Sequence, residues 1–154
     1  MPCATDAKRA ILYAARTLSG CLVEIFGDTK IVAVGTWEVA VIRCTRDLNL
    51  LDLRGPNAMK AGTVSGVCKD SNRSYSQQWS RFFYENSFLY EPISGTAIDG
   101  LLYGNAHNDE DALALYERCE RDFACTSECA LNDAALRTEI KLIALETGMY
   151  VQPY

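Results

Sequence analysis

The clearest periodic pattern lies near the start of the chain, where apolar residues recur with the period of a helix. The recurrence at i, i+3, i+4, i+7 and i+8 involves Leu18, Cys21, Leu22, Ile25 and Phe26. It predicts a helix over residues 17–27, ended by Gly27 and Asp28. The preceding residues 11–15 suit a short strand.

Further along the chain, short apolar segments bounded by turn residues predict strands. IVAVGTW and EVAVIRCT are rich in β-branched residues, LNLLDL is short and apolar, and IDGLLYGN runs into a turn. ALALY at 112–116 alternates as a strand does.

Two further helices are expected. Residues 73–90 carry an aromatic stripe made of Trp79, Phe82, Phe83 and Tyr90, which favours a buried helix face over a stacking platform for bases. The segment LNDAALRTEIKLIALETG reads as a closing helix. Its expected features are Asn132 as N-cap, a stripe of Leu136, Ile140 and Ile143, and Gly148 at C′. Helices among strands without a regular βαβ alternation predict an α+β fold.

Length and composition fit one domain spanning residues 1–154. The chain is 49% hydrophobic and 23% charged, as globular proteins are. No apolar run approaches the ~18 residues needed to cross a bilayer, and no signal peptide is evident. The seven scattered cysteines are therefore interpreted as reduced thiols of a cytoplasmic protein.

Charge is unevenly distributed along the chain. Residues 1–77 hold ten Lys and Arg against seven Asp and Glu, and residues 78–154 hold five against thirteen, which gives the net charge of −5. An acidic chain without a basic patch argues against direct binding to nucleic acid. The more basic first half is compatible with a small phosphorylated ligand.

Motifs for metal or nucleotide binding are absent from the sequence. Cys119, Cys125 and Cys129 follow His107, but their spacing lacks the paired arrangement of a zinc site, so no metal is expected. No glycine-rich nucleotide loop and no G-x-S-x-G elbow occur. HNDEDALALYE fails the EF-hand pattern and is read as a solvated turn.

Glu24 is a candidate functional acid, eleven residues after Tyr13. It falls just outside the apolar stripe of its predicted helix, where ordinary solvated charges also occur. In the last turn, the helix dipole disfavours an anion by ~0.3–1 kcal/mol. Periodicity alone favours an ordinary solvated charge over a functional acid.

Five segments in order resemble the RES domain family, named for its Arg, Glu and Ser residues. They are LYAARTLSGCLVEIFGD, TRDLNLLDL, SQQWSRFFYE, DGLLYGNAH and ALALYE. The resemblance runs from about Leu12 to the C-terminus. Members are toxins of bacterial toxin–antitoxin pairs, with an Xre-like antitoxin as partner.

The resemblance implies an enzyme that degrades NAD⁺. The implied fold is similar to ADP-ribosyltransferase toxins, and the nicotinamide–ribose bond is cleaved by water or by phosphate. NAD⁺ is then the substrate, no metal or membrane is involved, and a homo-oligomer is an open possibility. The cell compartment implied is the bacterial cytoplasm.

Residues carry over from the family by position. Tyr13 matches the family tyrosine and Glu24 the family glutamate, while Asn105 in YGN falls where many members have serine. The implied roles are a carboxylate that stabilises the ribosyl cation or activates the nucleophile for Glu24, and ring stacking or ribose binding for Tyr13. Asn105 is expected to hold ribose hydroxyls or the carboxamide.

The sequence departs from the family at its arginine. Counting about ten residues back from Tyr13 reaches Pro2 or Cys3, and neither nearby Arg9 nor Arg16 matches, so we expect the chain to start inside the domain. The alternative function is a degenerate RES module that binds an antitoxin without turnover. A third reading, a structural domain with an accidental resemblance, predicts that Tyr13, Glu24 and Asn105 do not converge on one cleft.

Overall fold

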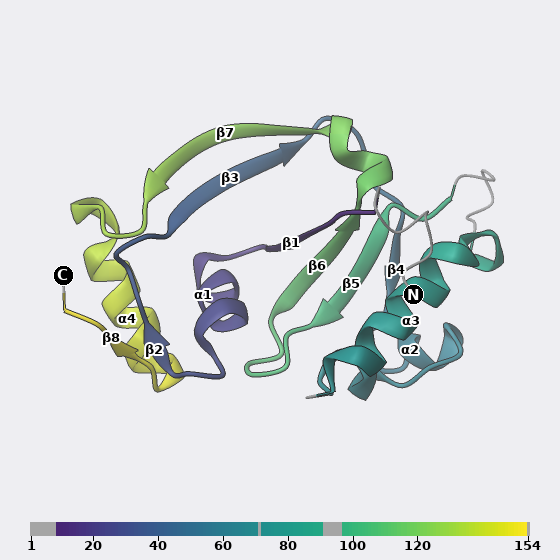
Figure 1. Ribbon diagram of the computed structural model, residues 1–154, viewed down its shortest axis with the longest axis horizontal. Coiled ribbons are helices and arrows are strands. Elements are labelled where there is room, and N and C mark those ends of the chain that lie inside the picture. The colour runs from purple at the N-terminus through teal and green to yellow at the C-terminus, as the bar shows by residue number, and fades with distance from the viewer. Residues whose placement is uncertain (1–8, 71, 91–96, 154) are drawn as a thin grey trace.

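The computed structural model describes residues 9–70, 72–90 and 97–153, and these form a single α+β domain with a mixed central sheet (Figure 1). The strands are β1 (Ile11–Ala15), β2 (Ile31–Val32), β3 (Glu38–Cys44), β4 (Leu50–Asp52), β5 (Gly100–Gly104), β6 (Asp111–Tyr116), β7 (Phe123–Ala130) and β8 (Tyr150–Val151). The helices are α1 (Leu18–Phe26), α2 (Asn57–Lys60), α3 (Arg73–Glu85) and α4 (Arg137–Thr147). Short 3₁₀ turns lie at Ser65–Cys68, Ser87–Tyr90, Glu117–Asp122 and Ala134–Leu136.

The central sheet has the strand order β1-β6-β5-β4, antiparallel except for the parallel pair β4–β5. Tyr13 of β1 pairs with Ala114 of β6, and Tyr103 of β5 pairs with Ala112 of β6. Paired residues share a face of a sheet, and so do residues two apart on a strand. The two tyrosines therefore stand on the same face, separated by the small side chains of Ala112 and Ala114.

Two hydrophobic clusters stabilise the domain. One covers this tyrosine-bearing face with α3, where Phe83 is fully buried and Trp79 and Tyr90 pack around it. The other joins α1 to α4 and the parallel pair β2–β8. Figure 1 shows α4 at the opposite end of the molecule from α3, with α1 between them.

The remaining pair, β3–β7, is an antiparallel ribbon with an irregularity between Val41 and Ile42. In Figure 1 it arches over α1 from the α4 end to the sheet end. The segment EVAVIRCT was predicted as a strand, and this is confirmed. The segment FACTSECA, which forms β7, was not predicted as a strand, because its polar residues hide the alternation typical of a half-buried strand.

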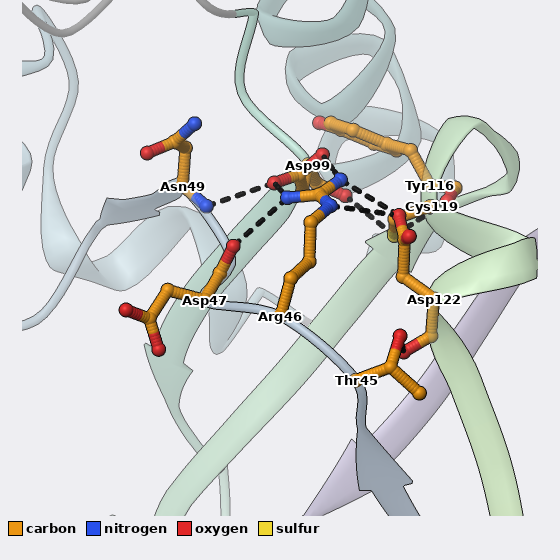
Figure 2. Close-up of polar contacts among 8 residues, drawn as sticks. All are labelled: Thr45, Arg46, Asp47, Asn49, Asp99, Tyr116, Cys119 and Asp122. Atoms are coloured by element: carbon orange, nitrogen blue, oxygen red, sulfur yellow. Dashed lines mark hydrogen bonds and ion pairs between the residues drawn. The ribbon is translucent and has the colours of Figure 1, made fainter.

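An ion pair between the exposed Arg46 and the buried Asp99 links the segment after β3 to the sheet (Figure 2). Arg46 donates to both carboxylate oxygens of Asp99, at 2.8 and 2.9 Å, and also to Asp122 at 2.9 Å. The backbone N–H of Asn49 donates to Asp99 at 2.8 Å. Burial would raise the pKa of the Asp99 carboxyl, but the hydrogen bonds from Arg46 and Asn49 outweigh it and hold that pKa below its usual value.

Several predicted boundaries are wrong. The predicted strand IVAVGTW shrinks to Ile31–Val32, and the helix expected over residues 73–90 ends at Glu85 before a 3₁₀ turn. The closing helix begins at Arg137, preceded by a turn whose N-cap is Asp133, which accepts from the N–H of Ala135, and Asn132 therefore caps nothing.

Other details of the predicted helices are confirmed or corrected. Gly148 has the left-handed φ of 68° expected at a helix end, and Ile140 and Ile143 are buried as predicted. In α1, Ile25 is exposed and Val23 is buried instead. The helix packs against α4 and β2 through Val23, which turns Ile25 toward solvent.

Candidate active site

Glu24 lies in the last turn of α1, on the side away from the buried face. Thr17 caps the N-terminus of this helix, and its hydroxyl accepts from the N–H of Gly20 at 2.9 Å. The side-chain amide of Asn105 donates to Oε2 of Glu24 at 2.6 Å, and the hydroxyl of Tyr103 lies 3.4 Å from Oε1. One carboxylate oxygen is thus firmly held and the other only weakly.

Asn105 follows β5 directly and is 1% exposed. Its Oδ1 accepts from the backbone N–H of His107 at 2.8 Å, which leaves Nδ2 to face Glu24. Both ends of its amide are therefore engaged within the protein. In this structure the Asn105 side chain is bonded to Glu24 and to the backbone of His107, and its expected contact with a ligand stays a prediction.

The two tyrosines of the sheet face are electrostatically coupled to Glu24. Burial, and next the negative charge of Glu24, raises the pKa of the Tyr13 phenol, while Arg73 acts in the opposite direction. Burial followed by the charges of Glu24 and Tyr13 also raises the pKa of Tyr103. Both phenols are protonated near neutral pH and can donate hydrogen bonds. Tyr13 is 57% exposed, so its ring is accessible.

Asn105 is thus bonded to Glu24, 81 positions away in the sequence, and the charge of Glu24 acts on the Tyr13 phenol. Neither of the two cavities described next is lined by these residues, so their convergence on one cleft stays a prediction. Their chemical roles stay predictions. Two surface cavities, of about 270 and 310 Å³, lie elsewhere: one is beside Arg137 and Pro153, and the other beside Leu48 and Tyr90.

Sequence reasoning missed two residues that interact with Glu24, Tyr103 and Cys68, and one cation that acts on Tyr13, Arg73. Tyr103 lies two residues before Asn105, and the sequence indicated only that it belongs to a strand. Burial, and then the charge of Glu24, raises the pKa of the Cys68 thiol to about 11, so this thiol is a poor nucleophile at neutral pH. Arg73 lies 3.6 Å from Asp28, one helical turn after Glu24. No sequence pattern linked Cys68 or Arg73 to Glu24.

The arginines near Tyr13 in sequence point to other partners. Arg9 donates to Glu85 at 3.1 Å and lies over the ring of Tyr84. Arg16 lies 3.5 Å from Asp111. The positive charge of Arg73 acts to lower the pKa of the Tyr13 phenol, against the effects of burial and of Glu24.

The acidic segment after His107 is more ordered than a solvated turn. Glu110 accepts from the hydroxyls of Thr17 and Ser19, and these bonds come first among the causes that lower its pKa. Within residues 9–70, 72–90 and 97–153, no group of three or more His, Cys, Asp or Glu side chains is arranged to hold a metal ion. No helix in the same described part of the chain is both long and apolar enough to cross a membrane.

Comparison with known proteins adds one match. Residues 4–136 match the RES domain, which is most of the chain. No curated protein and no solved structure matches. The family matched is the one suggested by the order of the five segments, and the chain belongs to the RES domain family.

Proposed function

We propose that this chain degrades NAD⁺ by cleaving the bond between nicotinamide and ribose. The single observation that carries the proposal is the carboxylate of Glu24, exposed on α1 and held at 2.6 Å by the buried amide of Asn105. A carboxylate fixed by one oxygen, with the other weakly bonded, is suited to face a developing positive charge. Membership of the RES domain family supports the same reaction.

The reaction breaks the bond between C1 of the ribose and the pyridinium nitrogen. Its electron pair goes to the ring, which leaves as neutral nicotinamide, and positive charge develops on the ribose. An oxygen of water or phosphate then bonds to C1. With water, a proton is released, and the proposed role of Glu24 is to accept it or to stabilise the ribosyl cation, as glycosidase carboxylates do.

Tyr13 is the proposed contact for the nicotinamide ring. Its side chain is accessible and stands on the same sheet face as Tyr103, with only Ala112 and Ala114 between them. Aromatic stacking contributes about 0.5–1.5 kcal/mol beyond area burial. Tyr103 and Asn105 are proposed to orient Glu24 rather than to contact the substrate.

A second candidate is a RES module that binds a partner without turnover. It is favoured by the arginines near Tyr13, because Arg9 and Arg16 contact Glu85 and Asp111. In either case the proposed partner is an Xre-like antitoxin in a bacterial cytoplasm. The implied likeness to ADP-ribosyltransferase toxin folds stays a prediction.

The experiment that tests the proposal identifies the products. Purified protein is incubated with NAD⁺ in phosphate-free buffer and in phosphate buffer, and the products are separated and identified by mass spectrometry. Free nicotinamide with ADP-ribose indicates water as acceptor, and nicotinamide with phosphorylated ADP-ribose indicates phosphate. Intact NAD⁺ in both buffers would favour the binding module.

A further inference from the structure

The turn between β5 and β6, residues 105–110, contacts α1 near both of its ends. At the N-terminal end, Glu110 accepts from Ser19 at 2.6 Å and from Thr17, the N-cap. A negative charge at this end is favoured by the helix dipole. The turn and the helix are therefore joined at Thr17 and Ser19, before Glu24, and again after it at Gly27 and Asp28.

His107 makes the contact at the C-terminal end of α1. Its ring Nε2 lies 3.2 Å from Oδ1 of Asp28. The ring also packs against the backbone of Gly27, where an added Cβ would lie 2.3 Å from Cδ2 of His107. Only a residue without a side chain allows the ring this close.

Between these two contacts, Asn105 is fixed by four hydrogen bonds. Its backbone N–H donates to the carbonyl of Glu110 at 2.8 Å, and its own carbonyl accepts from the N–H of Asp109 at 3.1 Å. Its Oδ1 accepts from the N–H of His107, and its Nδ2 donates to Glu24. The orientation of the amide thus depends on where the backbone of residue 107 is held.

We propose that His107 is a positioning residue for Glu24. Its ring, wedged between Gly27 and Asp28, holds the 105–110 turn against α1, so that the amide of Asn105 presents Nδ2 to the carboxylate. The ordinary alternative is a surface histidine beside an exposed acid, and such pairs contribute little to stability. The kinetic part of the test rests on the proposed function, whereas the structural part does not.

The test compares four forms of the full chain: wild type, His107→Ala, His107→Gln and Asp109→Asn. Glutamine reaches about as far as the imidazole Nε2 and can still donate to Asp28. Asp109→Asn is the control from the same turn, because its side chain is 74% exposed and Asn tolerates the left-handed φ of 61° at this position.

The first readout is the pair of side-chain amide resonances of Asn105 in ¹H–¹⁵N spectra, which requires no turnover. His107→Ala is expected to move them toward the shifts of a solvent-exposed asparagine. His107→Gln and Asp109→Asn are expected to keep them in place. Unchanged Asn105 resonances in His107→Ala would overturn the proposal.

The second readout is nicotinamide release. In His107→Ala we expect kcat to fall on the order of tenfold with KM unchanged, since misplacing a catalytic group slows the chemical step. Recovery in His107→Gln supports positioning, and an unchanged kcat in His107→Ala contradicts it.

Two further outcomes are also decisive. A wild-type chain that releases no nicotinamide defeats the proposed function, but the Asn105 resonances still decide the role of His107. If His107→Ala does not fold, Asp28→Ala takes its place, because it removes the exposed partner of the ring, together with the ion pair to Arg73, and keeps the imidazole itself. Displaced Asn105 resonances in that variant support the proposal, and unmoved ones overturn it.

Discussion

Nδ2 of Asn105 lies 2.6 Å from Oε2 of Glu24, although the two residues are 81 positions apart in the sequence. Asn105 is 1% exposed, whereas Glu24 is exposed to solvent. Such a bond to an ionised acceptor is about twice as strong as one between neutral groups. It fixes an acid that ordinary helix surfaces would leave free.

Asn105 is therefore expected to matter for activity through its donor group. Asn105→Asp keeps the shape but sets two carboxylates against each other, and Asn105→Ala removes the donor. We expect kcat/KM for nicotinamide release to fall on the order of 10²-fold in both, as for loss of one oriented donor. A variant that keeps wild-type kcat/KM while folded, as judged by circular dichroism, would contradict this role.

Two substitutions of Tyr13 distinguish stacking of its ring on NAD⁺ from a role of its hydroxyl in the reaction. Tyr13→Phe keeps the ring, so KM for NAD⁺ is expected to stay within about twofold. Tyr13→Ala is expected to raise KM about tenfold, which corresponds to a loss of about 1.4 kcal/mol. Initial rates over a range of NAD⁺ concentrations check this. A large loss of kcat in Tyr13→Phe would instead assign the hydroxyl a role in the reaction.

The Arg46–Asp99 pair predicts how stability depends on pH. The folded state lowers the pKa of Asp99, so its contribution is present above the unfolded pKa and is lost as pH falls through the folded one. Asp99→Asn is expected to lower the free energy of unfolding by about 2 kcal/mol at pH 7. Urea unfolding at a series of pH values should show that the difference in the free energy of unfolding between wild type and Asp99→Asn becomes smaller in acid.

Asp47→Asn is the matched control for that measurement. Asp47 is in the same segment, and Figure 2 shows its carboxylate pointing away from Arg46 and Asp99. Its unfolding free energy should stay within about 0.5 kcal/mol of wild type. An Asp99→Asn difference that is small at pH 7, or that grows in acid, would show that the pair does not stabilise the fold.

Helix α4 lies beyond the residues matched by the RES domain, but it shares a hydrophobic cluster with α1 and is predicted to contribute to the stability of the domain. Ile140 is fully buried, and Leu145 on the same helix is 80% exposed. Ile140→Ala should lower the free energy of unfolding by about 2–5 kcal/mol, because it leaves a cavity. Leu145→Ala should change it by less than about 0.5 kcal/mol. Similar losses for the two variants would mean that α4 packs differently.

The elements that could be predicted from the sequence were those with one strong period. ALALY alternates and residues 11–15 form a short apolar run, and both lie in the central sheet, while Ile140 and Ile143 mark the buried face of α4. β7 escaped prediction because cross-strand pairing with β3, not its own pattern, makes it a strand. Tertiary packing similarly decided that Val23, not Ile25, is buried.

The candidate site was predictable only in part. The resemblance pointed to Tyr13, Glu24 and Asn105, but no spacing along the chain shows that Asn105 donates to Glu24. His107 was read as an isolated histidine before an acidic turn. Its contact with Gly27 and Asp28 depends on how the β5–β6 turn folds back on α1, and that is a tertiary relationship.

The most direct test of the central claim is the initial rate of nicotinamide release from NAD⁺ by three purified proteins: wild type, Glu24→Gln and Glu38→Gln. Glu38→Gln makes the same chemical change at an exposed position at the start of β3. The account predicts release by wild type and Glu38→Gln, and a loss of at least 10²-fold in Glu24→Gln. Equal rates in wild type and Glu24→Gln, or no release by wild type, would contradict it.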